Sequence, residues 1–135
     1  MIVVDTNVIA SLWVPNDTDE LAYKVLEKDS DWIAPLLWRS EFRNVLTIYL
    51  RADILALSII LQAIEEAEQL MESKEFEINS TQVLSLVSES SCSSYDCEFV
   101  ALADDLDLRL VTFDKNINNE FPTIAMHPKQ FIAQS

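Results

Sequence analysis

The chain has 135 residues, half of them hydrophobic, and carries a formal net charge of -14. This length predicts one domain spanning residues 1–135, and the acidity argues against a protein that coats nucleic acid through a broad basic face. No apolar run approaches the roughly 20 residues of a membrane span, and the first apolar stretch lacks the basic flank of a secretory signal, so we expect a cytoplasmic protein with no membrane association.

Short apolar segments alternate with longer segments of helical periodicity along the chain. The predicted strands are residues 2–4, 32–34, 75–78, 109–112 and 123–125. The predicted helices are residues 7–12, 17–28, 36–50, 57–72, 80–88, a segment capped by Ser93 or Ser94 that runs to 106, a short turn after Lys115, and a terminal helix from Pro128. Helices between strands require crossover connections, so we expect an α/β fold, a three-layer α/β/α sandwich around a mostly parallel five-stranded sheet.

Two features of the composition constrain local structure and chemistry. The chain contains no glycine, so left-handed turn positions are expected to fall to Asn or Asp. The expected positions are Asn16, Asp53, Asn79, Asp107 and Asn118. Two cysteines, Cys92 and Cys97, and one histidine make no credible zinc site, and we expect both thiols to be reduced and without function.

Four carboxylates are placed where they can meet. Asp5 follows the first strand and Asp114 follows the strand at 109–112, so both belong at the carboxyl edge of a parallel sheet, where sites form in such folds. Glu41 lies early in the helix after the second strand, and Asp96 lies in the first turn of the helix before the fourth. Each has a simpler alternative: a turn residue, a solvated helix residue, or a partner of a helix dipole.

The segments that contain these acids resemble the four signature blocks of PIN-domain nucleases, most closely the small VapC-type toxin ribonucleases. The segments are Asp5-Thr6-Asn7, residues 40–46 (Ser-Glu-Phe-Arg-Asn-Val-Leu), Ser94-Tyr95-Asp96 with Ala101-Leu102-Ala103, and residues 110–115 (Leu-Val-Thr-Phe-Asp-Lys). The resemblance covers essentially the whole chain, with the blocks in order. It departs at Cys97, where a small Ala is common, and at Asp107, where Gly is common.

The resemblance implies a sheet ordered 3-2-1-4-5 and an acidic cluster that binds Mg²⁺ or Mn²⁺ and cleaves RNA. The implied catalytic and metal-binding residues are Asp5, Glu41, Asp96 and Asp114. Supporting roles are implied for Thr6, Asn7, Ser94 and Thr112. It also implies a homodimer and a small antitoxin partner, whose basic segment would suit the acidic pocket.

Two neighbouring families fit less well. Haloacid-dehalogenase phosphatases carry a second acid two residues after the first, and here that position is Asn7. Response-regulator receivers place an acid directly after the third strand, and here Ile78 is followed by Asn79 and Ser80. In each comparison this chain lacks the acidic side chain on which the chemistry of that family depends.

The chemistry of an acidic cluster is consistent with a divalent cation. Two unit charges about 4 Å apart repel by roughly 4 kcal/mol at a surface-like dielectric, so such a cluster protonates in part or holds a cation. Mg²⁺ and Mn²⁺ prefer oxygen ligands and can activate water and stabilise the leaving oxygen. We expect Asp5 and Asp96 to be direct ligands, with Glu41 and Asp114 acting through water.

The RNA contacts and partners are more open. Arg39, Arg43 and Lys115 are candidates for flanking phosphates of single-stranded or looped RNA, or they form salt bridges with the surplus acids. The apolar helices at 36–50 and 57–72 are candidates for a dimer interface, or they simply pack in the core. The alternative function is a non-catalytic PIN-fold module that binds a protein or RNA, and metal-dependent RNA cleavage distinguishes the two.

Overall fold

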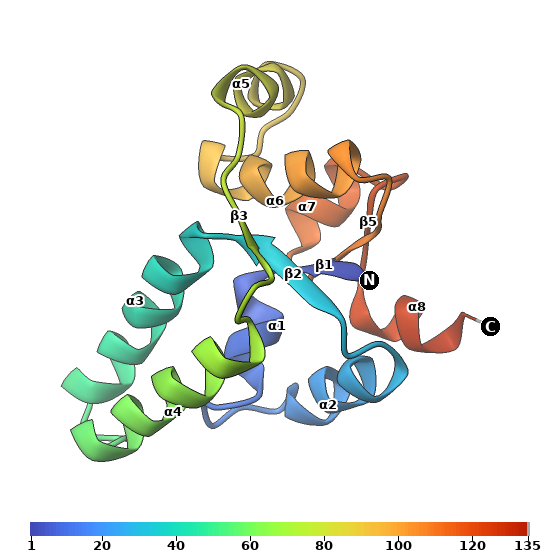
Figure 1. Ribbon diagram of the computed structural model, residues 1–135. Helices are drawn as coiled ribbons and strands as arrows, with labels where there is room; N and C mark the ends of the chain where they lie inside the picture. The colour runs from blue at the N-terminus through green and yellow to red at the C-terminus, as the bar shows by residue number, and fades with distance from the viewer. Residues whose placement is uncertain (135) are drawn as a thin grey trace.

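The computed structural model describes residues 1–134 and forms a parallel sheet with helices on both sides (Figure 1). The strands are β1 (Ile2–Val4), β2 (Trp32–Pro35), β3 (Glu75–Phe76), β4 (Leu110–Val111) and β5 (Ala125–Met126). They form a five-stranded sheet in the order β3-β2-β1-β4-β5, and every pairing is parallel. The predicted fold class and strand order are therefore confirmed.

The helices cover the two faces of the sheet. Their bounds are α1 (Thr6–Ser11), α2 (Asp19–Lys28), α3 (Leu37–Arg51), α4 (Leu57–Leu70), α5 (Ser80–Ser88), α6 (Ser94–Asp105), α7 (Lys115–Glu120) and α8 (Pro128–Ala133). In the view of Figure 1, α5 and α6 lie above the strands, α1, α2 and α8 lie below them, and the α3–α4 hairpin projects to the lower left. The result is the expected three-layer arrangement.

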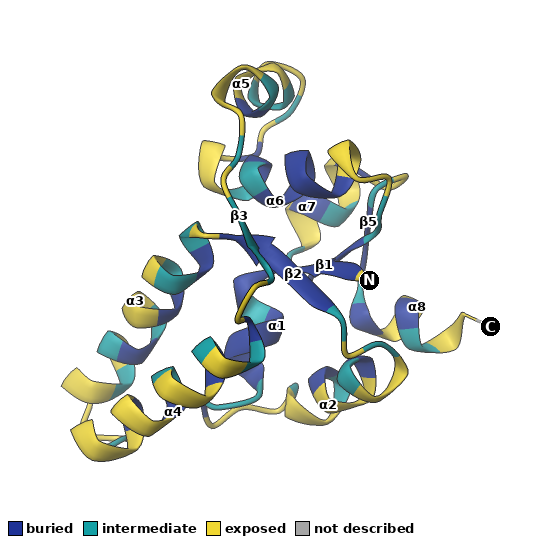
Figure 2. Cartoon of the chain, in the orientation of Figure 1, coloured by how far each residue is buried: buried dark blue, intermediate teal, exposed yellow. Residues whose placement is uncertain are grey.

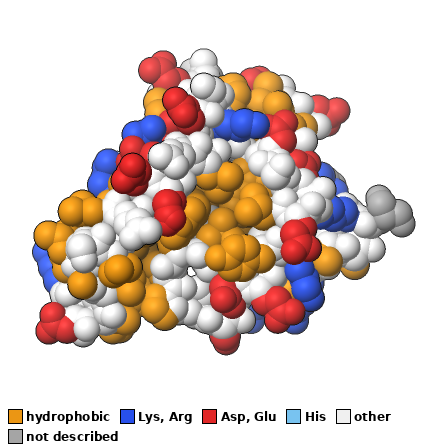
Figure 3. Space-filling model, turned by 60° about the horizontal axis from the view of Figure 1, so that its bottom comes forward, with side chains coloured by type: hydrophobic (Ala, Val, Ile, Leu, Met, Phe, Trp, Pro, Cys, Tyr) orange, Lys and Arg blue, Asp and Glu red, His pale blue; other side chains and the backbone are white. Residues whose placement is uncertain are grey.

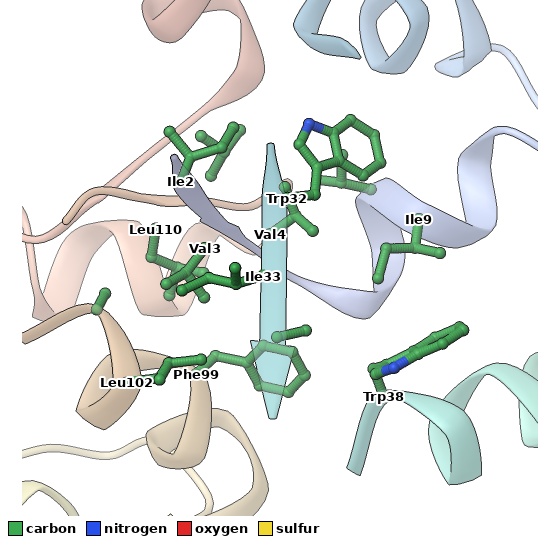
Figure 4. Close-up of a cluster of buried hydrophobic side chains, with 14 of the residues drawn as sticks. Ile2, Val3, Val4, Ile9, Trp32, Ile33, Trp38, Phe99, Leu102 and Leu110 are labelled. Carbon is green, nitrogen blue, oxygen red and sulfur yellow. The ribbon is translucent and has the colours of Figure 1, made fainter. Parts of the chain in front are cut away.

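The core lies around β1, the central strand. All of β1, β2 and β4 is buried, as the dark strands of Figure 2 show, which explains why these segments are apolar without alternation. Figure 4 shows Phe99 and Leu102 of α6 near Val3 and Leu110 of the sheet, and Trp38 on the opposite side. Because β1 is held on both edges and both faces, the residue that follows it has a fixed position.

Strand boundaries differ from the sequence prediction at the two sheet edges. β3 stops at Phe76 rather than Ile78, and β5 begins at Ala125, two residues later than predicted. The carbonyl of Phe121 accepts hydrogen bonds from the amides of both Ile124 and Ala125, which holds the preceding residues in a turn. Local periodicity does not resolve such a turn from a strand, since both are short and partly apolar.

In the absence of glycine, some of the predicted residues adopt the left-handed backbone conformation and others do not. Asp53 and Asp107 adopt positive φ, at 56° and 54°, as predicted, and Ser73 does so at 65°, which was not predicted. The predictions for Asn16, Asn79 and Asn118 were wrong. Asn79 caps α5 with a φ of -74° and Asn118 lies inside α7. Asn is favoured at helix caps as well as at left-handed positions, so its presence alone does not choose between them.

Two further findings concern the chain as a whole. Among the described residues, no helix combines the length and the apolarity needed to cross a membrane.

Both cysteines, Cys92 and Cys97, are free and buried. Burial raises the pKa of both thiols, that of Cys92 to about 11, so neither has the thiolate character of a reactive cysteine.

Candidate active site

Asp5 lies directly after β1 and caps the N-terminus of α1. Its Oδ1 accepts a hydrogen bond from the Thr6 amide at 2.8 Å, and its side chain is almost fully buried. The partial positive charge at a helix N-terminus favours an anionic cap. A strand that ends in Asp therefore both starts the next helix and delivers a carboxylate to the carboxyl edge of the sheet.

Thr112 and Asn7 contact the same oxygen of the Asp5 carboxylate and fix its position. Thr112 follows β4 and is fully buried, and its hydroxyl donates to Asp5 Oδ2 at 2.6 Å. Asn7 Nδ2 lies 3.5 Å from the same oxygen and 3.4 Å from Thr112 Oγ1, while Asn7 Oδ1 accepts from the Phe113 amide at 3.3 Å. These contacts join the ends of β1 and β4 and fix the rotamer of Asp5.

Glu41 is brought to Asp5 by the first turns of α3. The buried hydroxyl of Thr6 donates to Glu41 Oε1 at 2.7 Å, and no described residue donates to Oε2. Thr6 thus links the two acids, since its amide bonds one and its hydroxyl the other. Asn44 and Val45, one turn along α3, line the same cavity; sequence reasoning did not select them, although both stand in the block quoted above.

Asp96 lies in the first turn of α6, and Ser93 positions it. Ser93 Oγ accepts a hydrogen bond from the Asp96 amide at 3.1 Å, so Ser93 is the cap of this helix and Ser94 is its first residue. Ser94 is exposed and lines a neighbouring hollow with Ser80 and Glu98 instead. The structure thus places Ser93 as the contact of the Asp96 turn, and the supporting role of Ser94 stays a prediction.

Three of the four predicted acids face one cavity of about 280 Å³. Its lining consists of Asp5, Thr6, Asn7, Glu41, Asn44, Val45 and Asp96. Asp114 lies beside this cavity rather than in its wall. Its side chain caps α7 by accepting from the Ile117 amide at 3.0 Å, and its amide donates to Thr112 Oγ1 at 3.0 Å. Asp114 therefore contributes charge to the site and shares the Thr112 contact.

Burial, with a smaller contribution from neighbouring acids, raises the pKa values of three of the predicted acids. Burial raises the pKa of Asp5 to about 7, the charges of Glu41 and Asp96 add to this, and the Thr112 hydrogen bond opposes it. Burial also raises the pKa of Glu41, helped by the charge of Asp96, and that of Asp96, helped by the charge of Asp114. Such a cluster favours a bound proton or a bound cation.

The donor set fits a hydrated hard cation better than a closed metal cage. Among residues 1–134 no three His, Cys, Asp or Glu side chains are grouped closely enough to enclose a metal ion. Mg²⁺ does not need such a group, because it usually retains several waters and binds through one or two carboxylates. Asp5, Glu41 and Asp96 offer only oxygen atoms around the cavity, which matches Mg²⁺ or Mn²⁺ and not zinc.

The predicted phosphate contacts divide into two groups. Arg39 forms a bidentate pair with Glu75, with its Nε and Nη2 at 2.6 and 2.8 Å from the carboxylate oxygens, and Nη1 lies 3.1 Å from Glu68. This guanidinium ties α3 to β3 and α4, so Arg39 forms the salt bridges that were the alternative to RNA binding. The second group consists of Arg43 and Lys115. Both are exposed and form no ion pair among the described residues, so their charges are available to a ligand.

Comparison with known protein families shows which family the chain matches. The family model described as PIN domain matches residues 2–119, which is most of the chain and includes all four predicted acids. No curated protein matches the chain.

Proposed function

Because this chain belongs to the PIN-domain family, whose members are generally nucleases, we propose that it is a metal-dependent endoribonuclease that hydrolyses RNA phosphodiester bonds. The observation that carries the proposal is the convergence of Asp5, Glu41 and Asp96 on one cavity at the carboxyl edge of the sheet. Their raised pKa values support it, because a cluster under mutual repulsion gains most from a divalent cation.

The proposed roles of the four acids are those expected from the sequence. Asp5 and Asp96 would hold Mg²⁺ or Mn²⁺ directly, with Glu41 and Asp114 acting through water. The bound cation would supply Lewis-acid activation of the phosphodiester and of the attacking water. Glu41 Oε1 is engaged by the Thr6 hydroxyl, so Oε2 is the atom available to orient that water or accept its proton. Thr112 and Asn7 keep Asp5 in place throughout.

Two exposed cations that neighbour predicted acids along the chain suggest how RNA approaches an acidic protein. Arg43 lies on α3, two residues after Glu41, and Lys115 follows Asp114 at the start of α7. Two isolated cations can hold the phosphates that flank the scissile bond, but they cannot form a platform for a duplex. We therefore propose single-stranded or looped RNA as the substrate.

A toxin in a type II toxin–antitoxin pair is the biological role that we propose for this nuclease. The chain is small, and its net charge of -14 suits a partner with a basic segment. A small antitoxin with such a segment would neutralise the acidic cavity and block access to Asp5, Glu41 and Asp96. The observation in favour of this role is the strongly acidic net charge of the chain.

Self-association through the α3–α4 hairpin is a further part of the proposal. Large aliphatic side chains are half or more exposed along it: Ile48, Ile54, Leu57, Ile59 and Leu61. Figure 3 shows hydrophobic side chains gathered over this hairpin at the left of the view. A helix that is apolar on several sides is normally buried, so we propose that a second copy of the chain covers α4 in a homodimer.

The test of the nuclease function is cleavage of labelled RNA with Mg²⁺, with Mn²⁺ and with EDTA. Single-stranded and hairpin RNAs should be cut with either metal and remain intact in EDTA. Asp96→Asn should abolish cleavage, whereas Asp104→Asn, which removes an exposed acid from the same helix, should not. RNA binding without cleavage under every metal condition would instead support the non-catalytic module.

A further inference from the structure

A second cavity, beyond the β5 edge of the sheet, differs from the rest of this acidic protein. It has a volume of about 330 Å³ and includes Arg109, Asn118, Asn119, Gln130 and Gln134 in its lining. No Asp or Glu side chain is part of this lining. In a chain with 23 acids and nine Lys and Arg residues, a cavity that combines a guanidinium with carboxamides and excludes carboxylates has a distinct electrostatic character.

Arg109 lines this cavity and uses only part of its hydrogen-bonding capacity within the fold. Its Nε donates to the Ile124 carbonyl at 3.0 Å and its Nη2 to the Ala125 carbonyl at 3.2 Å. These two bonds use two of the five N–H donors of a guanidinium and fix its plane. In the described part of the chain Arg109 makes no ion pair, unlike Arg39, so its charge is not neutralised.

The carboxamides add neutral donors around this charge. Gln130 uses its Oε1 to accept from the His127 amide, which leaves its Nε2 as a donor. Asn118 is not one of these donors, because its Nδ2 donates to the Thr112 carbonyl at 3.0 Å and its buried Oδ1 is an acceptor without a partner among the described residues. The supporting donors are therefore the side chains of Asn119, Gln130 and Gln134. A planar guanidinium with neighbouring N–H donors matches the oxygens of a phosphate group, to which charge-assisted hydrogen bonds are short and strong.

We infer that this cavity is a phosphate-binding site, separate from the acidic cluster. Arg109 precedes β4 whereas Thr112 and Asp114 follow it, so the two sites belong to opposite ends of one strand. The bound group is a phosphomonoester or phosphodiester, with Arg109 as its main contact and the carboxamides as supporting donors. The volume lies at the low end of ligand cavities, which suits a single nucleotide unit.

The test is a titration of the isotopically labelled protein followed by nuclear magnetic resonance in EDTA, where RNA stays intact. The probes are inorganic phosphate, adenosine 5′-monophosphate and a short single-stranded oligoribonucleotide, with sodium chloride as the control for ionic strength. Phosphate should cause saturable shifts of the Arg109 Nε–H signal and of the side-chain amides of Asn119, Gln130 and Gln134. The probe that saturates at the lowest concentration identifies the source of the phosphate group.

Two variants test the assignment, and a third is the matched control. Arg109→Gln should weaken phosphate binding by about tenfold or more. Gln134→Glu should weaken it too, by placing an anion in the wall while keeping every Arg109 contact, so that the test does not depend on how Arg109→Gln folds. Gln69→Glu makes the same change on the exposed face of α4, at the other side of the sheet, and should leave binding intact. Shifts scattered over the surface, or binding unchanged in Gln134→Glu, would overturn the inference.

Discussion

The hydroxyl of Thr112 donates to Oδ2 of Asp5 at 2.6 Å, in a pair of buried residues that follow neighbouring strands of the sheet. The bond lowers the pKa of Asp5, against the larger effect of burial that raises it. Thr112 Oγ1 also accepts from the Asp114 amide, so one hydroxyl connects two of the predicted acids. This connection makes Thr112 the most informative residue outside the acids themselves.

Thr112→Val, which keeps the shape and removes the hydroxyl, should destabilise the fold by about 1–3 kcal/mol because it leaves buried partners unsatisfied. It should also lower RNA cleavage about 10–100-fold, the usual effect of removing a group that holds a ligand. Thr112→Ser keeps the hydroxyl and should retain most activity at a cost of about 1 kcal/mol for the missing methyl. Urea unfolding and cleavage rates measure both; equal rates for Val and Ser would contradict the role of the hydroxyl.

Asp5 should make the stability of the metal-free protein fall as pH rises. Its folded pKa of about 7 lies above its ordinary value of 3.8, so between these values the native state binds more protons than the unfolded state. Under this linkage the free energy of unfolding decreases with rising pH across that window, and the penalty is complete above about pH 7. Asp5→Asn should therefore gain stability relative to the parent as pH increases from 4 to 7.5. Urea melts in EDTA at several pH values check this, and parallel profiles would refute it.

Divalent cations should stabilise the native state through the acidic cluster. A ligand that binds only the native state adds about 2.7 kcal/mol at a hundredfold excess over its Kd, so Mg²⁺ or Mn²⁺ should raise the Tm. Asp96→Asn should be at least as stable as the parent without metal, because repulsion is relieved, and should lose much of the metal-induced shift. Asp104→Asn is the control. Thermal melts that show the same metal response in Asp96→Asn and in the parent would remove Asp96 from the site.

Arg39 and Arg43, one helical turn apart on α3, should have opposite phenotypes. Arg39→Ala should cost about 1–3 kcal/mol, because Glu75 is left partly buried with only the Trp38 indole as a donor at 2.7 Å. Arg43→Ala should change stability by less than about 0.5 kcal/mol, since that side chain is exposed, and should weaken RNA cleavage. Chemical unfolding and cleavage at several RNA concentrations separate the two effects; a Km effect for Arg39→Ala alone would reverse the assignment.

The exposed aliphatic side chains of the α3–α4 hairpin should hold a dimer together. Leu61→Lys introduces a charge where the side chain is 56% exposed in the single chain, so it should disrupt association without unfolding the monomer. Leu84→Lys, at a similarly exposed position on α5, is the matched control and should leave the mass unchanged. Light scattering at high micromolar concentration gives the mass directly. A monomeric parent would exclude this interface.

Most of the fold could be predicted because its signals are local. Apolar strands, helical periodicity and the crossover rule were enough for the layers, and the strand ends located Asp5 and Asp114 at one edge. The family resemblance supplied the strand order, which no local pattern contains. The bounds of the short strands were predicted less well, since β3, β4 and β5 have only two residues each and a pattern of that length carries little information.

The details of the site depended on contacts between distant residues. Arg39 pairs with Glu75, which lies 36 positions away in the sequence. The sequence of an amphipathic helix does not show whether an Arg side chain on it binds a carboxylate of the same chain or a phosphate. Likewise Ser93 and Ser94 are the same residue type in adjacent positions, so the sequence cannot tell which of them caps α6. The backbone conformation makes Ser93 the cap. Contacts between residues far apart in the sequence are therefore harder to predict than the chemical type of the residues that a site contains.

The central position of β1 has a consequence for how the protein is made. β1 pairs with β4, and Asp5 is held by the hydroxyl of Thr112; in both cases the partner lies 107 positions later in the chain. Pairings between such distant segments form late, because the intervening chain must first be present and ordered. The cavity lined by Asp5 therefore forms only after β4 has paired with β1, so any activity that depends on this cavity requires the completed sheet.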